Sequence, residues 1–389
     1  MRRFVICLLS AALLLATSGC AGTSKQSSTG VTDGVQSAYD IEITGSMELE
    51  YAKQFTVDHR SDGCSVITIG EDSFLLVPEG METPAAVGDM TVIRQPVNEI
   101  YLAASSAMDL FDGIGGLDRV TMTSTEEKNW SLPNVKAALE NGSLTYIGKY
   151  SSPDYEALAE NGCGLAIEST MIYHSPETRE KLESLGIPVL VERSSYETHP
   201  LGRMEWLKLY GLLLGRSDEA ERYFKEKTAV FDEIARKNSA ENGSERPTAA
   251  FFYISSNGYV NIRKPDDYVA KMIELAGGEY IFTAGDLDLD DNALSTMNIQ
   301  TEKFYELARD ADILIYNSTI EGELFNIEQL IEKCGILADF KAVKEGNVWC
   351  TGQNMFQQTT GAADMIADLN RIFTGTAGDE LTYLHRAER

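Results

Sequence analysis

Apolar residues between positions 200 and 238 fall at the spacing of two consecutive helices. The first helix carries Met204, Trp206, Leu207, Leu209 and Tyr210. It is expected to end near Gly215, because glycine adopts the positive φ of a helix C-terminus at no steric cost. In the second helix Ser217 supplies an N-cap, and apolar residues recur at 220, 223, 224, 230, 231 and 234. The pattern predicts a long helix over residues 217–238 with one buried face.

Short apolar strands alternate with helices on both sides of this segment. Before it, the pattern predicts strands at 99–103, 120–123, 144–147, 164–167 and 188–191, with helices at 105–111, 133–141, 153–160 and 176–185. After it, the pattern predicts strands at 249–254, 313–316 and 347–350, with helices at 268–276, 327–334 and 361–373. Such alternation is typical of parallel sheets covered by helices. The predicted fold class is α/β, with two lobes, each a mostly parallel sheet flanked by helices, joined by one long connecting helix.

The N-terminus has the features of an export signal. Arg2 and Arg3 precede an apolar run from Phe4 to Ala16, which is too short to span a bilayer as a mature helix. Small residues lead to Cys20, and this ending resembles a bacterial lipoprotein lipobox, although Thr17 stands where leucine is usual. The resemblance implies an exported protein held on the outer face of the cell membrane by a lipid on Cys20. Ordinary cleavage with Cys20 unmodified is the alternative.

Three β-rich runs at 53–58, 65–70 and 73–78, separated by turns, predict a small meander before the first parallel sheet. The predicted organisation is therefore a signal peptide (1–19), a lipid-anchored flexible tether (20–39), an N-terminal α/β lobe with the meander at its start (40–216), the connecting helix (217–238), a C-terminal α/β lobe (245–375) and a tail (376–389).

Charge and cysteine content exclude some functions and leave others open. The 389-residue chain has a formal net charge of −27, which opposes binding to nucleic acid and to anionic lipid head groups. Beyond Cys20 the chain has four scattered cysteines without a CxxC pair, so the sequence does not support a zinc cluster. They allow three disulfide pairings, or they are buried free thiols.

Motifs of catalysis are missing from the sequence. It has no GxSxG, HExxH, Walker A or GxGxxG pattern, and its four histidines are far apart. Residues 286–292 imitate the start of a calcium-binding loop, but Asp291 and Met297 occupy positions where glycine and glutamate are required. We interpret this segment as a solvated acidic loop, and we expect no enzymatic activity and no resident metal or cofactor.

Four stretches, in order, resemble one family. They are LGIPV at 185–189, the connecting helix, IELAGG at 273–278 and FKAVKEGNVW at 340–349. Over roughly residues 95–373 the chain resembles the substrate-binding proteins of ABC importers for iron–siderophores, haem and cobalamin. The resemblance implies a monomer that binds a small metal chelate between its lobes and delivers it to an ABC permease with its ATPase. An iron–siderophore is the favoured ligand; a corrinoid or haem is the alternative, and an anchored enzyme or an adhesin is less favoured.

The same resemblance implies two transporter-docking glutamates, one in each lobe. In the first lobe the position corresponds to Glu156, at the start of a helix and eleven residues before the end of the next strand. In the second lobe it corresponds to Glu302, although the spacing to the next strand is longer than usual and Glu306 is a rival.

Ligand-binding candidates lie in loops expected at strand ends. Aromatic faces suit a planar or catecholate ligand, and arginines suit its negative charge. His174 is also a candidate axial ligand for haem iron or for cobalt, although a lone histidine is more often polar lining. The candidates are Tyr150, Tyr173, His174, Tyr196, Arg203, Tyr253, Asn257, Tyr259, Arg263 and Met355.

Overall fold

The computed structural model describes residues 41–85, 87–240, 245–289, 295–378 and 381–389. The predicted signal peptide, the acylated Cys20 and the tether lie outside these residues. Part of the acidic loop at 286–292 lies outside them as well. Within the described ranges, no helix is both long and apolar enough to cross a membrane.

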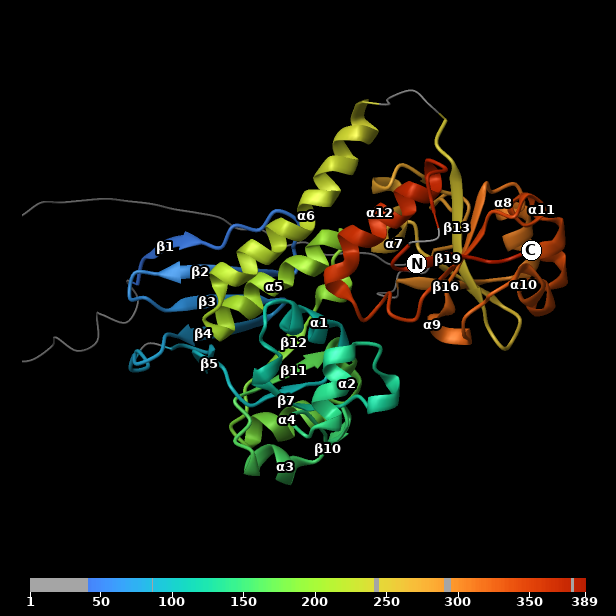
Figure 1. The fold of residues 1–389 in the computed structure, drawn as a ribbon. Helices are drawn as coiled ribbons and strands as arrows, with labels where there is room; N and C mark the ends of the chain where they lie inside the picture. Colours follow the sequence, from blue (N-terminus) through green and yellow to red (C-terminus); the bar gives the residue numbers. More distant parts are fainter. Residues whose placement is uncertain (1–40, 86, 241–244, 290–294, 379–380) are drawn as a thin grey trace, which may run out of the picture. The chain divides into compact units, whose positions relative to one another are not determined.

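The first sheet is built from the N-terminal residues of the described chain (Figure 1). Its strands, in spatial order, are β1 (Ile43–Ser46), β2 (Phe55–Arg60), β3 (Ser65–Ile69), β4 (Asp72–Val77) and β5 (Thr91–Arg94). Neighbouring strands from β1 to β4 run antiparallel to each other, and β5 runs parallel to β4. In β3, buried and half-buried residues alternate, so one face of the sheet packs on the core. The segment predicted as a meander forms β2 to β4, while the sequence pattern missed β1 and β5.

A second, fully parallel sheet forms the first lobe. Its spatial order is β12 (Val189–Glu192), β11 (Leu165–Ser169), β6 (Ile100–Leu102), β7 (Val120–Thr123) and β8 (Thr145–Tyr146). The helices between the strands are α1 (Ser105–Gly113), α2 (Pro133–Glu140), α3 (Tyr155–Glu160) and α4 (Pro176–Ser184). Proline opens α2 and α4, where its missing N–H costs nothing. A two-stranded ribbon of β9 (Gly148–Lys149) and β10 (Ser152–Pro153) precedes α3.

The third sheet forms the second lobe and is mixed. Its spatial order is β16 (Thr296–Ile299), β14 (Val260–Arg263), β13 (Thr248–Ile254), β17 (Ile313–Tyr316), β18 (Val348–Thr351) and β19 (Leu384–Arg386), with β15 (Glu279–Tyr280) also paired to β13. The pairs β13–β17 and β17–β18 are parallel, whereas β14, β16 and β19 run antiparallel to their neighbours. The helices are α7 (Tyr268–Leu275), α8 (Thr301–Ala308), α9 (Ser318–Glu321), α10 (Ile327–Lys333), α11 (Lys341–Glu345) and α12 (Ala362–Phe373). The predicted α/β fold class is confirmed.

Two helices lie between the last strand of the first lobe and the first strand of the second (Figure 1). Helix α5 (Pro200–Leu214) is buried along nearly its whole length, and Gly215 ends it with φ +70°. Helix α6 (Ser217–Ala240) follows after one turn and is about 36 Å long at 1.5 Å per residue. It packs against α5 and against α12 of the second lobe. The domain boundaries that the sequence predicts stay a prediction.

Two buried carboxylates attach the first sheet to α5. The backbone N–H groups of Glu50, Tyr51 and Ala52 donate to the carboxylate of Glu205 over 2.8–2.9 Å. Those of Lys53 and Gln54 donate to Glu197 over 2.8–3.0 Å. We call this set of contacts the carboxylate clamp: the Glu197 and Glu205 side chains with the amides of residues 50–54. It satisfies consecutive backbone donors that lie outside any strand, and it satisfies two charges that would otherwise be costly to bury.

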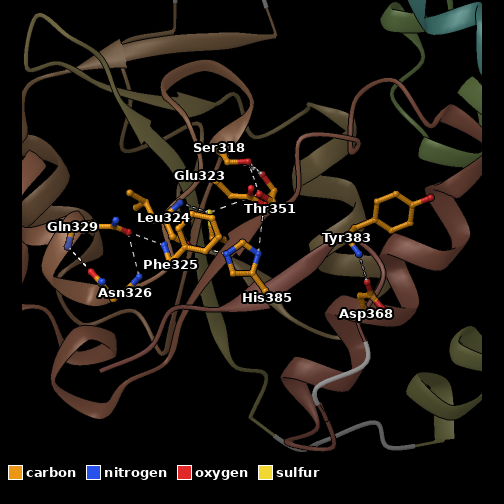
Figure 2. A network of polar contacts seen from close by, with 11 residues as sticks. Ser318, Glu323, Leu324, Phe325, Asn326, Gln329, Thr351, Asp368, Tyr383 and His385 are labelled. Carbon is orange, nitrogen blue, oxygen red and sulfur yellow. Dashed lines mark hydrogen bonds and ion pairs between the residues drawn. The ribbon is translucent and has the colours of Figure 1, made fainter. Parts of the chain in front are cut away.

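The sequence predicts a tail over 376–389, but Leu384–Arg386 form β19 at the edge of the third sheet. Figure 2 shows the contacts that hold this segment. The carboxylate of Asp368 accepts from the N–H groups of Thr382 and Tyr383, each at 2.8 Å. The imidazole Nε2 of His385 lies 2.8 Å from the carbonyl oxygen of Leu324. Residues 384–386 are therefore part of the third sheet and not of an unpaired tail, because backbone pairing and a buried carboxylate hold them in place.

The four cysteines of the described chain are unpaired thiols. Cys163 and Cys350 are buried, and burial raises the pKa of each thiol to about 11. Such thiols stay protonated at neutral pH and are weak nucleophiles. Of the alternatives left open by the sequence, the structure contains free thiols.

Replacing Glu205 by glutamine should lower the free energy of unfolding by about 3 kcal/mol. Three N–H donors point at the oxygens of Glu205, so an amide NH₂ at this position must face at least one of them. The change also removes the negative partner of the Lys208 ammonium, which lies 3.0 Å away. Urea denaturation at pH 7 measures the effect.

Glu221 provides the matched control, because it contacts the same Lys208 ammonium from an exposed position. Glu221→Gln should change the free energy of unfolding by less than about 0.5 kcal/mol. Equal stability of the two variants would contradict the importance of the carboxylate clamp.

Candidate functional site

Loops from both lobes lie at the carboxyl ends of parallel strands. In the first lobe these loops follow β6, β7, β11 and β12, and in the second they follow β13, β17 and β18. Open α/β sheets bind ligands at this edge, because the backbone there is free of pairing and the loops supply varied side chains. We therefore expect the site among these loops and the helices that begin beside them.

Two arginines converge on one aromatic ring. The guanidinium carbon of Arg203, in the first turn of α5, lies 4.0 Å from the ring centroid of Tyr268. That of Arg263, at the end of β14, lies 5.6 Å from the same ring and 4.7 Å from the ring of Phe356. Cations over aromatic faces are held by the ring quadrupole, and the contact strengthens as water is excluded. The structure thus brings together two of the predicted arginines from elements on either side of α6.

Carboxylates balance these two charges. Asp267 lies 3.5 Å from the Arg263 guanidinium and caps α7 by accepting the N–H of Val269 at 2.9 Å. Burial raises the pKa of Asp267, while Arg263 and Arg203 oppose that shift. Burial also raises the pKa of Glu192, which accepts from the Ser194 N–H at 2.7 Å and from the Ser106 hydroxyl at 3.2 Å. Within the described chain the Nε of Arg203 is buried without a hydrogen-bond partner, so one strong donor is available to an anionic group.

A small cavity lies beside Arg203. It encloses about 20 Å³, which is room for about one water molecule. Apolar and aromatic side chains dominate its wall, with the predicted Met355 among them. The lining residues are Pro200, Arg203, Tyr268, Met272, Met355, Phe356, Gln358, Thr359, Gly361, Ala362, Met365 and Tyr383.

The remaining predicted ligand residues lie apart from this cavity. Tyr173, His174, Asn257 and Tyr259 are exposed, and Tyr150, Tyr196 and Tyr253 are half-buried. The ring of Tyr196 lies 4.9 Å from the guanidinium of Arg193. Among the ten candidates, Arg203 and Met355 line the cavity, and Arg263 lies against two of the rings that line it, those of Tyr268 and Phe356.

Sequence reasoning missed Tyr268, Phe356 and Asp267. In the sequence Tyr268 is the first residue of a predicted helix, and Asp267 before it is of a type favoured at the N-cap position. Arg263 and Asp267 are four residues apart, and they form an ion pair because the chain turns between β14 and α7. The sequence alone does not show this turn. Nothing in the local pattern indicates that Phe356 reaches Arg263.

Larger depressions lie elsewhere on the molecule. One of about 1000 Å³ includes Pro247, Asp312 and Asn347, and another of about 600 Å³ includes Glu99, Gly164 and Pro188. These residues directly precede strands of the two lobe sheets, so both depressions lie at the amino ends of strands. That is the opposite edge from the one where α/β sheets bind ligands. A third depression, of about 780 Å³, lies along β14 and β16 and includes neither Arg203 nor Tyr268. We assign the site to the smaller cavity in spite of its size, because it includes both of these residues.

The predicted docking glutamates both lie in exposed first turns of helices. Glu156 is in the first turn of α3, whose N-terminus is capped by Asp154, and Glu302 is in the first turn of α8. Glu306, the rival, is also exposed on α8. Among the described residues, no three His, Cys, Asp or Glu side chains gather in a metal-holding group.

A buried carboxyl group lies near the candidate edge of the first lobe. Glu168 is fully buried near the carboxyl end of β11, and within the described chain neither of its oxygens has a hydrogen-bond partner. Burial raises its pKa to about 8, so the group is protonated at neutral pH. Burial raises the pKa of the nearby Tyr101 hydroxyl, and the negative charge that Glu168 acquires at high pH raises it further.

Comparison with known proteins gives a consistent result. A family model described as periplasmic binding protein matches residues 100–355. An uncharacterized lipoprotein of Methanocaldococcus jannaschii is 26% identical over 278 residues, which are 68% of this chain and 62% of that protein. A second uncharacterized lipoprotein of the same organism is 25% identical over 360 residues, covering 89% of this chain and 88% of its own length.

Solved structures show the same fold at low identity. The periplasmic haem-binding protein of Pseudomonas aeruginosa is 16% identical with a TM-score of 0.59, over 75% of this chain and 98% of that one. A periplasmic binding protein of Veillonella parvula is 16% identical with a TM-score of 0.58, over 83% and 98%. The periplasmic haem-binding protein HutB of Vibrio cholerae is 15% identical with a TM-score of 0.55, over 69% and 97%.

Replacing Glu168 by glutamine should remove a pH dependence of stability. The unfolded chain releases this proton near pH 4.5, whereas the folded protein holds it until about pH 8. Between those values the folded state binds more protons, so its stability falls as the pH rises, by up to about 1.4 kcal/mol per pH unit. The amide mimics the neutral acid, and the variant should lose that slope in urea denaturation between pH 5 and pH 8.

Glu180→Gln, at an exposed position on α4, is the control and should keep the wild-type slope. A Glu168→Gln variant with an unchanged slope would show that Glu168 ionises normally in the folded protein.

Proposed function

The chain belongs to the periplasmic binding protein family, and on this basis we propose that it captures a metal chelate between its lobes and delivers it to an ABC importer. An iron–siderophore is the proposed ligand. The convergence of Arg203 and Arg263 on Tyr268 supports this proposal most directly, because it combines positive charge with aromatic surface. Ferric chelates carry anionic oxygen donors on planar or apolar frames, and both features match that combination.

Haem is the second candidate, and the named relatives favour it. Two of the similar structures are haem-binding proteins of Pseudomonas aeruginosa and Vibrio cholerae, and another is the Staphylococcus aureus protein IsdE complexed with haem. A structure described as a possible iron-binding protein of Staphylococcus epidermidis belongs to the same set. Two guanidinium groups suit the two carboxylates of haem as well as they suit a siderophore. A corrinoid, the other alternative that the resemblance implies, is the third candidate.

We further propose that the protein is a monomer without catalytic activity, anchored through a lipid on Cys20. The two Methanocaldococcus relatives are named as lipoproteins, which supports the anchor. The protein should stay with the membrane fraction until Cys20 is replaced by alanine. Glu156 and Glu302 are the proposed contacts to the importer, since each presents an exposed carboxylate on the first turn of a helix of its lobe.

Fluorescence titration of the part from residue 41 tests the proposed ligand class. A ferric siderophore should quench the aromatic fluorescence saturably at micromolar concentration or below, and haem and cobalamin are titrated in parallel. Arg203→Ala should weaken an anionic chelate by about 1.5–3 kcal/mol, which is roughly tenfold to more than a hundredfold. The control is Arg222→Ala, an exposed position on α6 that should leave affinity unchanged.

Quenching by haem alone would move the assignment to haem. The absence of saturable binding by any of the three ligands would overturn the metal-chelate proposal.

Replacing Glu156 and Glu302 together by alanine should leave chelate affinity unchanged and abolish uptake in cells that depend on this importer. Both side chains are exposed and lie apart from the cavity at Arg203, so they contribute to docking and not to the site. Replacing Glu306 alone by alanine separates the two second-lobe candidates. Lost affinity, or normal uptake by the double variant, would contradict the docking roles.

A further inference from the structure

The loop that follows β18 in the second lobe is bonded to the first lobe. We call residues 352–361 the strap. The side chain of Gln357 makes contacts on both sides of Trp130 in the first lobe. Its Oε1 accepts from the N–H and from the hydroxyl of Ser131, each at 2.7 Å, and its Nε2 donates to the carbonyl oxygen of Asn129 at 2.7 Å.

A second set of bonds holds the end of the strap on α1. The Thr359 hydroxyl donates to the carbonyl oxygen of Ser106 at 2.8 Å, and the Thr360 N–H donates to the carboxylate of Asp109 at 2.7 Å. Asp109 and both threonines are buried, whereas Gln357 is half-buried. The bonds at Thr359 and Thr360 are thus shielded from water, and those of Gln357 compete with water more readily.

The strap also carries part of the cavity wall. Met355 and Phe356 directly precede Gln357, and both line the cavity beside Arg203. The ring of Phe356 covers the guanidinium of Arg263 at 4.7 Å. A shift of Met355 and Phe356 therefore moves the cavity wall and uncovers Arg263. It also displaces Gln357, the next residue in the chain.

The cavity at Arg203 has to enlarge before a ligand fits. It encloses about 20 Å³, whereas ligand sites for small molecules commonly occupy about 300–1,000 Å³. Met355 and Phe356 lie in the strap outside any helix or strand, so a movement of these two residues makes space against Arg203 with the least disturbance of the fold. Because Gln357 follows them in the chain, its bonds to Asn129 and Ser131 break in that movement, while Thr359 and Thr360 can stay bound to α1.

We propose that Gln357 is a latch: its bonds to Asn129 and Ser131 hold the strap closed over the two arginines, and their release admits the ligand. The chemistry of the ligand rests on the proposed function, but the latch itself does not. If the strap is open in only a fraction of the molecules, the apparent affinity and the association rate are both reduced in proportion to that fraction. Gln357 is thus a positioning residue that sets how fast and how tightly the site is filled.

Amide hydrogen exchange tests the latch without any ligand. The N–H of Ser131 donates directly to Gln357, so Gln357→Ala should speed its exchange about tenfold, with a smaller change at the amides of Thr359 and Thr360. Gln357→Glu keeps an acceptor for Ser131 and loses the donor to Asn129, and its exchange rate should lie between the two. Gln353→Ala, at an exposed position of the same strap, is the control and should leave Ser131 unchanged.

Stopped-flow binding of a ferric siderophore supplies the second readout. Gln357→Ala should associate about tenfold faster than wild type, and Gln353→Ala should match wild type. Unchanged exchange at Ser131 in Gln357→Ala would overturn the latch, as would faster exchange with unchanged association. Faster exchange in a protein that binds none of the chelates would overturn the proposed function and would support only the part of the proposal in which Gln357 holds the strap on the first lobe. Thermal unfolding of each variant separates a local release from global destabilisation.

Discussion

Five consecutive backbone amides, those of residues 50–54, donate to the carboxylates of Glu197 and Glu205, and the arrangement of the first lobe depends on these bonds. The Trp206 indole N–H also donates to Glu197 at 3.0 Å, so the two acidic groups are buried in a shell of donors. A buried charge is tolerable only when such partners surround it. The chain between β1 and β2 thus supplies the hydrogen-bond donors for two buried charges, that of Glu197 just before α5 and that of Glu205 within α5.

This attachment also fixes the candidate site. Gly202 packs directly on the chain at Tyr51: a Cβ there would lie 3.0 Å from the Tyr51 carbonyl oxygen, so only glycine fits without displacement. Arg203, the next residue, therefore begins its path toward Tyr268 from a constrained backbone. The second lobe supplies Tyr268, Arg263 and the strap, and its own edge is held by Asp368 and β19. Each lobe therefore supplies one part of the candidate site.

The sequence predicted those parts of the fold that are specified by local periodicity. The buried helix ending at Gly215 and the central strands of both lobe sheets have strong apolar patterns and appear where expected. Strands β1 and β19 were missed because one is exposed at every residue and the other has only three residues, so neither carries an alternating pattern. Their pairing is decided by partners distant in the chain. Arg203 and Arg263 were found because a positive residue near a strand end is conspicuous in an acidic chain. The Tyr268 ring between them is 65 residues from Arg203 in the sequence, and no local pattern reports such a contact.

The carboxylate clamp also determines how the protein responds to a mechanical force. A pull on the chain that precedes β1 first meets the β1–β2 pairing, which starts at Ile43 opposite Arg60 and opens one bond at a time. The load then reaches the amides of residues 50–54, whose bonds to Glu197 and Glu205 share it. Strand β1 is therefore expected to separate from β2 first, and the carboxylate clamp is expected to resist further extension of the chain. Tension that reaches the clamp is taken up by Glu197 and Glu205, which lie on either side of Arg203 in the chain, so the clamp carries a load applied at the N-terminus to the segment that holds one arginine of the candidate site.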